Sequence, residues 1–224
     1  MLTKEQCYEQ LLLGKAVKPE GSSARWLEAI RVEALESAKA LNFPSDRHDD
    51  WRFTDLSPLF QHGFQPVGSF AGLKLADIEK FLIPSSIRLV FVDGSYDAGL
   101  SDLAQAGAGV KVKSLVECLG DPQVEAHFAR HVSFKQDAFA ALNTRFFEDG
   151  AFVHVSSENA TGEVAAPIHI LHVATKHKTP SAIYPRCLVV MEANSRATVV
   201  EDYAGLEDGI NFSDAVTEVV LKDH

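Results

Sequence analysis

The feature that most restricts the possible folds is a change of pattern after Gly150. Beyond this glycine we find no helical periodicity but five runs rich in β-branched residues, at residues 151–156, 167–175, 186–193, 197–204 and 214–221. Runs of this kind, separated by loops rich in Ser, Gly, Lys and Pro, predict β-strands. Their spacing is uneven and mostly wider than the roughly 8–12 residues of a hairpin meander. Such steps fit either a jelly roll or a parallel β-helix, and spacing alone does not choose between the two.

The first 150 residues are predicted to be mainly helical. Thr3 and Gln6 have the spacing of a capping box, which indicates a helix that begins at Thr3. A second helix is expected to start near residue 22 or 23, because its apolar residues fall on one stripe. Pro44 then ends this helix.

Three further elements are predicted from local signals in the same part of the chain. The continuous apolar run at residues 89–92 is typical of a buried strand. Pro122 suits the first position of a helix that runs to about His131. A last helix is expected over residues 136–147, closed by Gly150.

A helical part followed by a run of strands indicates the α+β class. We therefore expect residues 1–150 to form a mainly helical domain with a short strand near residues 89–92, and residues 151–224 to form a strand-rich unit. The last strong strand ends near Leu221, and a sheet or solenoid usually has its final edge covered. We therefore expect the sequence to be a fragment whose bare final strand permits homodimers.

The net charge of −10 narrows the classes of partner. It disfavours nucleic acids and anionic membrane surfaces as main partners. The longest uncharged stretch, residues 56–73, is interrupted by polar residues, glycine and proline, so no membrane span is predicted. Glu5 and Glu9 lie where a signal peptide would carry its basic and apolar regions. The expected location is the cytoplasm, or an organelle interior if a transit peptide has been removed.

The three cysteines, Cys7, Cys118 and Cys187, are far apart in the sequence and form no C-x-x-C pair. A disulfide framework or a four-thiolate metal site within one chain is therefore not expected. We interpret all three as structural residues. The sequence also contains no phosphate-binding glycine loop and no G-x-S-x-G nucleophile motif.

The histidines provide the main alternative, an enzymatic function. A cupin-like metalloenzyme would use His154, His169 and His172 together with Glu201. His169 and His172 are three residues apart, however, and on one strand this spacing turns the two rings to opposite faces. We therefore expect one ring in the core, the other facing outward, and no shared metal ion.

The remaining polar residues give no stronger site. His127 and His131 share one face of a predicted helix, but they lack the adjacent glutamate of a zinc protease, so we interpret them as solvated or capping. Glu201 and Asp202 are adjacent on a strand and point to opposite faces, so they do not form an acid–base dyad. Glu218, like Glu192, interrupts an apolar strand, and we expect an outer solvated face or a protein interface there. We therefore assign no catalytic, cofactor-binding or metal-binding role to these residues.

The segment that joins the last predicted helix to the first strand resembles a hallmark of a known family. It reads Phe139-Ala-Ala-Leu-Asn-Thr-Arg-Phe-Phe-Glu-Asp-Gly-Ala-Phe-Val-His154 and is similar to the SufB/SufD family of iron–sulfur cluster assembly proteins. Supporting pieces occur in the family's order: Asp50-Trp-Arg-Phe-Thr-Asp-Leu56, Phe91-Val-Asp-Gly94 with Leu100-Ser-Asp-Leu103, Pro167-Ile-His-Ile-Leu-His172, Pro185-Arg-Cys-Leu-Val-Val-Met-Glu192, Val199-Val-Glu-Asp-Tyr203 and Ala215-Val-Thr-Glu-Val-Val220. The first of these pieces is more similar to SufD than to SufB.

The resemblance covers nearly the whole chain, and it implies a right-handed parallel β-helix after residue 150, truncated in this sequence. It also implies a non-enzymatic scaffold subunit that pairs with SufB and with the ATPase SufC. Such a SufBCD complex builds iron–sulfur clusters and passes them to carrier proteins, while SufC binds the ATP. In this family the SufC-binding helices and the groups implicated in cluster building lie toward the C-terminus. No functional residue of the family maps onto this chain, so we expect it to bind no cofactor.

Overall fold

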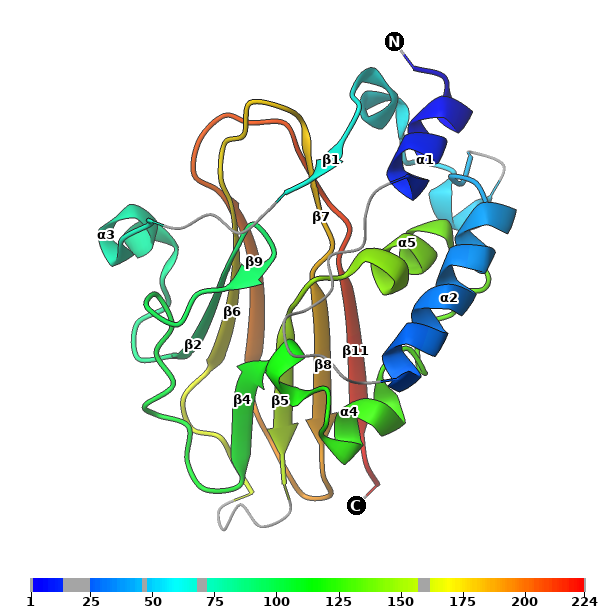
Figure 1. The fold of residues 1–224 in the computed structure, drawn as a ribbon. Helices are drawn as coiled ribbons and strands as arrows, with labels where there is room; N and C mark the ends of the chain where they lie inside the picture. Colours follow the sequence, from blue (N-terminus) through cyan, green and yellow to red (C-terminus); the bar gives the residue numbers. More distant parts are fainter. Residues whose placement is uncertain (1, 14–24, 46–47, 68–71, 157–161, 224) are drawn as a thin grey trace.

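The computed structural model describes residues 2–13, 25–45, 48–67, 72–156 and 162–223. It combines helices with sheets of mainly parallel strands, so the predicted α+β class is confirmed. Figure 1 shows most of the helices gathered beside a stack of long strands, with the C-terminal strand on the helical side.

Most helices begin at the residues that local signals predict. Their bounds are α1 Lys4–Leu12, α2 Arg25–Ala40, α3 Leu75–Ile78, α4 Pro122–His127 and α5 Ala138–Phe146, with short 3-10 helices at Asp49–Trp51, Ser57–Gln61, Glu79–Phe81 and Val116–Cys118. The capping box is confirmed, because Thr3 Oγ1 accepts from the amide of Gln6 at 3.1 Å and Gln6 Oε1 accepts from the amide of Thr3 at 2.9 Å. The expected start of the second helix, at residue 22 or 23, lies outside the described residues.

All five predicted strand runs after residue 150 are confirmed. The strands are β1 Gln65–Pro66, β2 Ile87–Val92, β3 Ser95–Tyr96, β4 Val110–Ser114, β5 Ala151–Val155, β6 Ile168–Ala174, β7 Ser181–Ile183, β8 Arg186–Met191, β9 Val199–Gly205, β10 Asn211–Ser213 and β11 Val216–Leu221. The predicted runs are β5, β6, β8, β9 and β11. The strands β7 and β10 have three residues each, which is too short for an alternating pattern to be recognised.

From β5 onward, each strand pairs in parallel with the strand three elements later in the chain. β5 pairs with β8, β6 with β9, β7 with β10 and β8 with β11. The register is continuous across the turns, since Val153 faces Val189, which in turn faces Val219. Hairpin meanders and jelly rolls pair their strands antiparallel, so β5 to β11 adopt neither arrangement.

Strands from the first 150 residues cover one end of all three sheets. β1 pairs with β7, β2 pairs with β6, and β4 pairs antiparallel with β5. β2 is the strand predicted near residues 89–92, and it turns into β3 through Asp93 and Gly94, which both have positive φ. This cover pairs backbone groups that would otherwise form an open edge. Within the described residues, β9, β10 and β11 are the unpaired edges at the other end.

A small apolar core includes Val90 of β2 and Leu171 of β6, and two larger cores hold the helices and sheets together. One lies inside the stack of sheets and includes Val153, Ile170 and Val189. The other lies between the helices and the outer sheet face and includes Leu27 of α2 and Phe152 of β5. Because adjacent strand residues point to opposite faces, β5 contributes to both cores.

Two predictions of what ends a helix are wrong, although α5 ends within one residue of its expected end. α4 ends at His127 rather than near His131, because Ala129 has a φ of 56°, which interrupts the helical backbone. α5 ends at Phe146, so Gly150 does not close a helix. Instead, Gly150 lies directly against the backbone of Arg186 at the start of β8.

Candidate functional site

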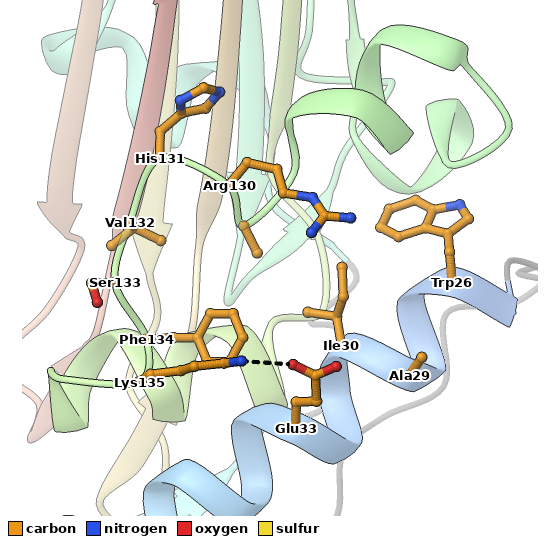
Figure 2. Close-up of a pocket in the computed structure, with 11 residues that line it drawn as sticks. Trp26, Ala29, Ile30, Glu33, Arg130, His131, Val132, Ser133, Phe134 and Lys135 are labelled. Carbon is orange, nitrogen blue, oxygen red and sulfur yellow. Dashed lines mark ion pairs between the residues drawn. The ribbon is translucent and has the colours of Figure 1, made fainter.

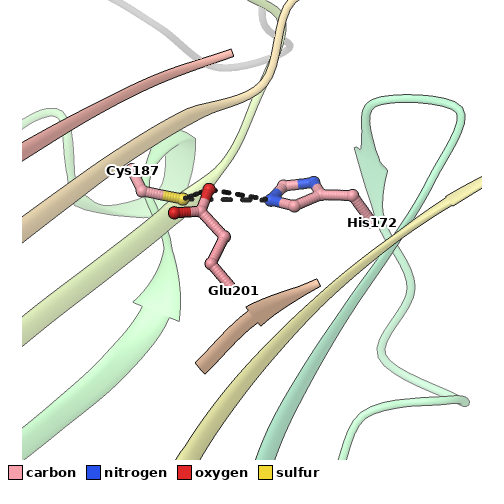
Figure 3. A group of neighbouring side chains, drawn as sticks. All are labelled: His172, Cys187 and Glu201. Atoms are coloured by element: carbon pink, nitrogen blue, oxygen red, sulfur yellow. Dashed lines mark hydrogen bonds and ion pairs between the residues drawn. The ribbon is translucent and has the colours of Figure 1, made fainter. Parts of the chain in front are cut away.

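Three polar side chains from three different strands meet at one place inside the stack of sheets. They are His172 of β6, Cys187 of β8 and Glu201 of β9, and Figure 3 shows their polar ends converging. Cys187 Sγ lies 3.1 Å from Glu201 Oε1 and 3.8 Å from His172 Nε2. His172 Nε2 lies 3.7 Å from Glu201 Oε1. We call these three residues the interior triad.

Strand alternation and the parallel register explain this convergence. On β6, His172 follows Ile168 and Ile170 at every second position, and both isoleucines belong to the interior core. In the β6–β9 register, Ile170 faces Glu201, which places this carboxylate beside the same interior column. Cys187 belongs to the same core from the opposite sheet. The triad therefore interrupts a column that is otherwise apolar.

Two aromatic rings enclose the imidazole of His172. The ring of Phe91 is stacked at a centroid distance of 5.0 Å, and the ring of Tyr203 is stacked at 4.9 Å. His172 is only 2% exposed. Burial lowers the pKa of His172 to about 4, against the opposing influence of Glu201, so the imidazole is neutral at pH 7.

The thiol of Cys187 and the carboxylate of Glu201 are linked by a hydrogen bond. Burial raises the pKa of the Cys187 thiol well above its usual range, and the nearby Glu201 charge raises it further. The thiol therefore donates to Glu201 Oε1. Glu201 also accepts hydrogen bonds from the hydroxyls of Tyr203, at 2.5 Å, and Thr217, at 2.7 Å. Three donors thus compensate this carboxylate for its partial removal from water.

The ligand atoms of the interior triad all lie within 4.8 Å of one another. A thiol, an imidazole and a carboxylate are the side chains that zinc and iron ions bind in proteins. The sequence places His172 and Glu201 together in the cupin-like set, but Cys187 is expected to be a structural residue. Only the parallel register joins residues from β6, β8 and β9, and no local spacing in the sequence signals that register.

The histidines of the expected cupin-like set do not converge. His154 Nε2 lies 3.1 Å from Glu192 Oε1, and His169 Nε2 lies 3.0 Å from Asp202 Oδ2. His169 and His172 do meet different partners on opposite faces of β6, as the spacing predicts. The expectation that one of them faces outward is wrong, because both side chains are buried.

The expected outward position of Glu218 is also wrong. Its side chain is buried and forms an ion pair of 2.6 Å with Arg186, which is buried as well. Glu218 additionally accepts hydrogen bonds from the amides of Ala129, at 2.8 Å, and His131, at 2.9 Å. It therefore ties the segment after α4 to β11. Glu192, by contrast, is partly exposed and binds Lys222 at 2.8 Å.

His127 and His131 approach each other although the helix ends between them. Their rings are stacked, with Nδ1 of His127 3.2 Å from Nε2 of His131. Burial, followed by the charge of His131, lowers the pKa of His127. Within the described residues, no third metal-ligating side chain completes this pair.

The acidic pair Glu148-Asp149 lies at the junction between α5 and β5. Burial raises the pKa of Glu148 to about 7 and that of Asp149 to about 6. Asp149 accepts hydrogen bonds from the Ser114 hydroxyl and the amides of Val116 and Gly150. These contacts order the junction, and they fit a structural function better than a catalytic one.

A surface groove of about 550 Å³ lies between α2 and the segment 129–135. Figure 2 shows Trp26 and Ile30 of α2 facing this segment, with an ion pair between Lys135 and Glu33 across the groove. The paired side chains are 67% and 57% exposed, so the pair contributes little stability. The groove lacks the convergence of buried polar groups that the interior triad has.

Comparisons with known proteins agree with the resemblance found in the sequence. The family model described as the SufBD protein N-terminal region matches residues 2–170. An iron–sulfur cluster assembly SufBD family protein of Synechocystis sp. is 28% identical over 205 residues, which cover 87% of this chain and 44% of that protein. The iron–sulfur cluster assembly proteins SufD of Escherichia coli and Bacillus subtilis are each 24% identical, over 81% and 92% of this chain and 40% and 47% of their own lengths. The chain thus spans less than half the length of these relatives.

None of the described helices is both long and apolar enough to span a bilayer.

Proposed function

Because this chain belongs to the SufBD family, we propose that it is part of a non-enzymatic scaffold subunit in iron–sulfur cluster assembly. The observation that carries the proposal is the family match over residues 2–170, joined by the similarity to two proteins named SufD. In this function the nascent cluster is cargo of the assembled complex, and it is passed on to carrier proteins.

The proposed framework for this function is the beginning of a right-handed parallel β-helix. The parallel pairing of each strand with the strand three elements later supports it, because a coil brings each strand beside its counterpart one turn later. Residues 151–224 then form the first coils, and residues 1–150 form a mainly helical domain that closes one end. A stack in which each coil is fixed by its neighbours gives a stiff rod with long faces for partner subunits.

We propose a SufB-type subunit and the ATPase SufC as the partners, in the cytoplasm. The β-helix docks beside SufB, and ATP-driven closure of SufC shears the interface between the two subunits. The unpaired edges of β9, β10 and β11 favour pairing with a second copy of this chain. The net charge of −10 is consistent with protein partners rather than nucleic acid.

An enzymatic function has less support from the geometry. A cupin-like site would need the nitrogens of His154, His169 and His172 at one point. Glu192 and Asp202 instead hold the first two histidines at separate positions. The described histidines therefore favour a scaffold over a metalloenzyme of this type.

Co-purification tests the proposed partners. The full-length protein is co-expressed with an untagged SufB and SufC of its own organism and captured through a tag. We expect SufB and SufC to be retained in a constant molar ratio through gel filtration. The tagged protein eluting alone, under conditions in which it is folded, would contradict the proposal.

A further inference from the structure

We propose that His172, Cys187 and Glu201 bind one divalent transition-metal ion of the zinc or ferrous-iron kind. This inference goes beyond the scaffold function and does not depend on it, because it concerns only side chains of this chain. Thiolate and imidazole are preferred ligands of these ions, and carboxylates complete many such sets.

The spacing of the ligand atoms fits an ion of this size. Metal bonds of about 2.3 Å to sulfur and about 2.0–2.2 Å to nitrogen and oxygen separate tetrahedral ligand atoms by about 3.4–3.6 Å. In the interior triad the three separations are 3.1 Å, 3.7 Å and 3.8 Å. Each differs from the tetrahedral range by about half an ångström or less. Small side-chain rotations would therefore place all three atoms around one ion.

The imidazole of His172 has few protein contacts that explain its polar atoms. Its Nδ1 atom has no hydrogen-bond partner among the described residues. Its Nε2 atom lies 3.7 Å from Glu201, beyond the usual hydrogen-bond length of about 2.7–3.2 Å, and its other polar contact is the weak one with Cys187 Sγ at 3.8 Å. Buried polar groups are normally paired, so this weakly partnered ring is suited to bind an ion. Phe91 and Tyr203 hold the ring in orientation, which a hydrogen bond to the second nitrogen usually does for a metal-bound histidine.

Metal binding at the triad is balanced in protons and charge. In the metal-free chain the Cys187 thiol donates its proton in a hydrogen bond to Glu201. When the metal–sulfur bond forms, the thiol loses this proton, which is released to solvent. The thiolate and the Glu201 carboxylate together neutralise the two positive charges of the ion, while His172 binds as the neutral imidazole. A site of zero net charge is compatible with burial. No oxidant or reductant is required.

The Glu201 side of the triad provides the route of entry. The Cys187 and His172 side chains are buried, whereas Tyr203 and Thr217, which donate hydroxyl hydrogen bonds to Glu201, are exposed. An incoming ion would first meet the carboxylate and then the two buried ligands. With three protein ligands, a tetrahedral ion keeps its fourth position open to water.

Titration with Co²⁺, a spectroscopic substitute for zinc, tests the site directly. The chain is purified without an affinity tag, reduced, freed of metal with a chelator and titrated anaerobically. We expect one equivalent of Co²⁺ to produce thiolate-to-cobalt charge-transfer absorption and the strong visible bands of a tetrahedral ion. Absence of charge-transfer absorption after several equivalents would overturn the proposal.

Substitutions assign the absorption to the triad. Cys187→Ser is expected to abolish the charge-transfer band, whereas Cys118→Ser, which removes another buried thiol, is expected to leave it unchanged. Glu201→Gln and His172→Phe should each weaken Co²⁺ binding by at least about 100-fold. Loss of an outer-shell partner alone costs up to about that factor, and these two residues bind the ion directly. His172→Phe keeps an aromatic ring between Phe91 and Tyr203, and circular dichroism verifies that each variant is folded. A band that survives Cys187→Ser or is lost in Cys118→Ser would overturn the assignment, and Glu201→Gln carries the test if Cys187→Ser does not fold.

Competition distinguishes the two natural ions. We expect Zn²⁺ to remove the cobalt bands at lower concentration than Fe²⁺ does, as the usual order of divalent affinities requires. Both ions should release one proton per chain when they bind to the metal-free protein. Cobalt bands that persist in an excess of both ions would contradict a site of this kind.

Discussion

Replacing Gly150 by alanine is expected to lower the free energy of unfolding by at least about 3 kcal/mol. A β-carbon at this position would lie 1.6 Å from the carbonyl oxygen of Arg186 and 2.5 Å from its carbonyl carbon. These are backbone atoms at the start of β8, and they cannot rotate away as a flexible side chain can. The methyl group would therefore force β5 and β8 apart where their pairing begins.

Gly107→Ala is the matched control for this substitution. A β-carbon at Gly107 meets no atom within 4 Å, so we expect a change of less than about 0.5 kcal/mol. Urea denaturation of the two variants and the parent chain, at one pH, gives the comparison. If Gly150→Ala unfolds at the same urea concentration as Gly107→Ala, the close approach of the two strands is not as described.

Glu218→Ala is expected to destabilise the chain by about 3–5 kcal/mol, because it leaves the Arg186 guanidinium charged and unpaired in the interior. Burial acts to raise the pKa of Glu218, but the charge and hydrogen bonds of Arg186 lower it overall, which indicates a true ion pair. Arg186 further donates to Asn143 and Thr144 of α5. The pair therefore connects α5, the segment after α4 and the two strands β8 and β11.

Two comparisons isolate the electrostatic part of this effect. The double variant Arg186→Met with Glu218→Met removes both charges, so it is expected to lose less stability than Glu218→Ala alone. Glu36→Ala removes one partner of an exposed ion pair with Lys39 and should cost less than about 1 kcal/mol. A loss below 1 kcal/mol in Glu218→Ala, or a double variant less stable than the single one, would contradict the buried pair.

Local signals in the sequence suffice for elements that depend only on neighbouring residues. The capping box of Thr3 and Gln6 and the start of α4 at Pro122 both occur where the sequence predicts them. The long strands are visible as β-branched runs for the same reason. The end of α4 was not predictable in this way, because it depends on the bond from Glu218, which is 89 residues from Ala129 along the chain.

The candidate site depends on contacts that no local pattern encodes. In the sequence, Glu201 is a candidate ligand only within the cupin-like set, and Cys187 is expected to be a structural residue. Only the parallel register places them beside His172. The same argument applies to Glu218. The sequence predicts an outward position for its side chain, but the carboxylate is buried because it pairs with Arg186 on the neighbouring strand. Family resemblance supplied the parallel arrangement, which strand spacing left open.

The central claim is that the protein acts as a scaffold rather than as a catalyst. The most direct test is to measure cluster assembly at different amounts of the protein. SufB and SufC of the same organism are supplied with ferrous iron, a sulfide source, reductant and ATP, and the yield of cluster passed to an apo-carrier is measured. A scaffold must be present in stoichiometric amount, so we expect the yield in a single round to rise in proportion to added full-length protein and to level off at a fixed ratio to SufB. Full yield from a few per cent of that amount, or a yield independent of the protein, would contradict the account.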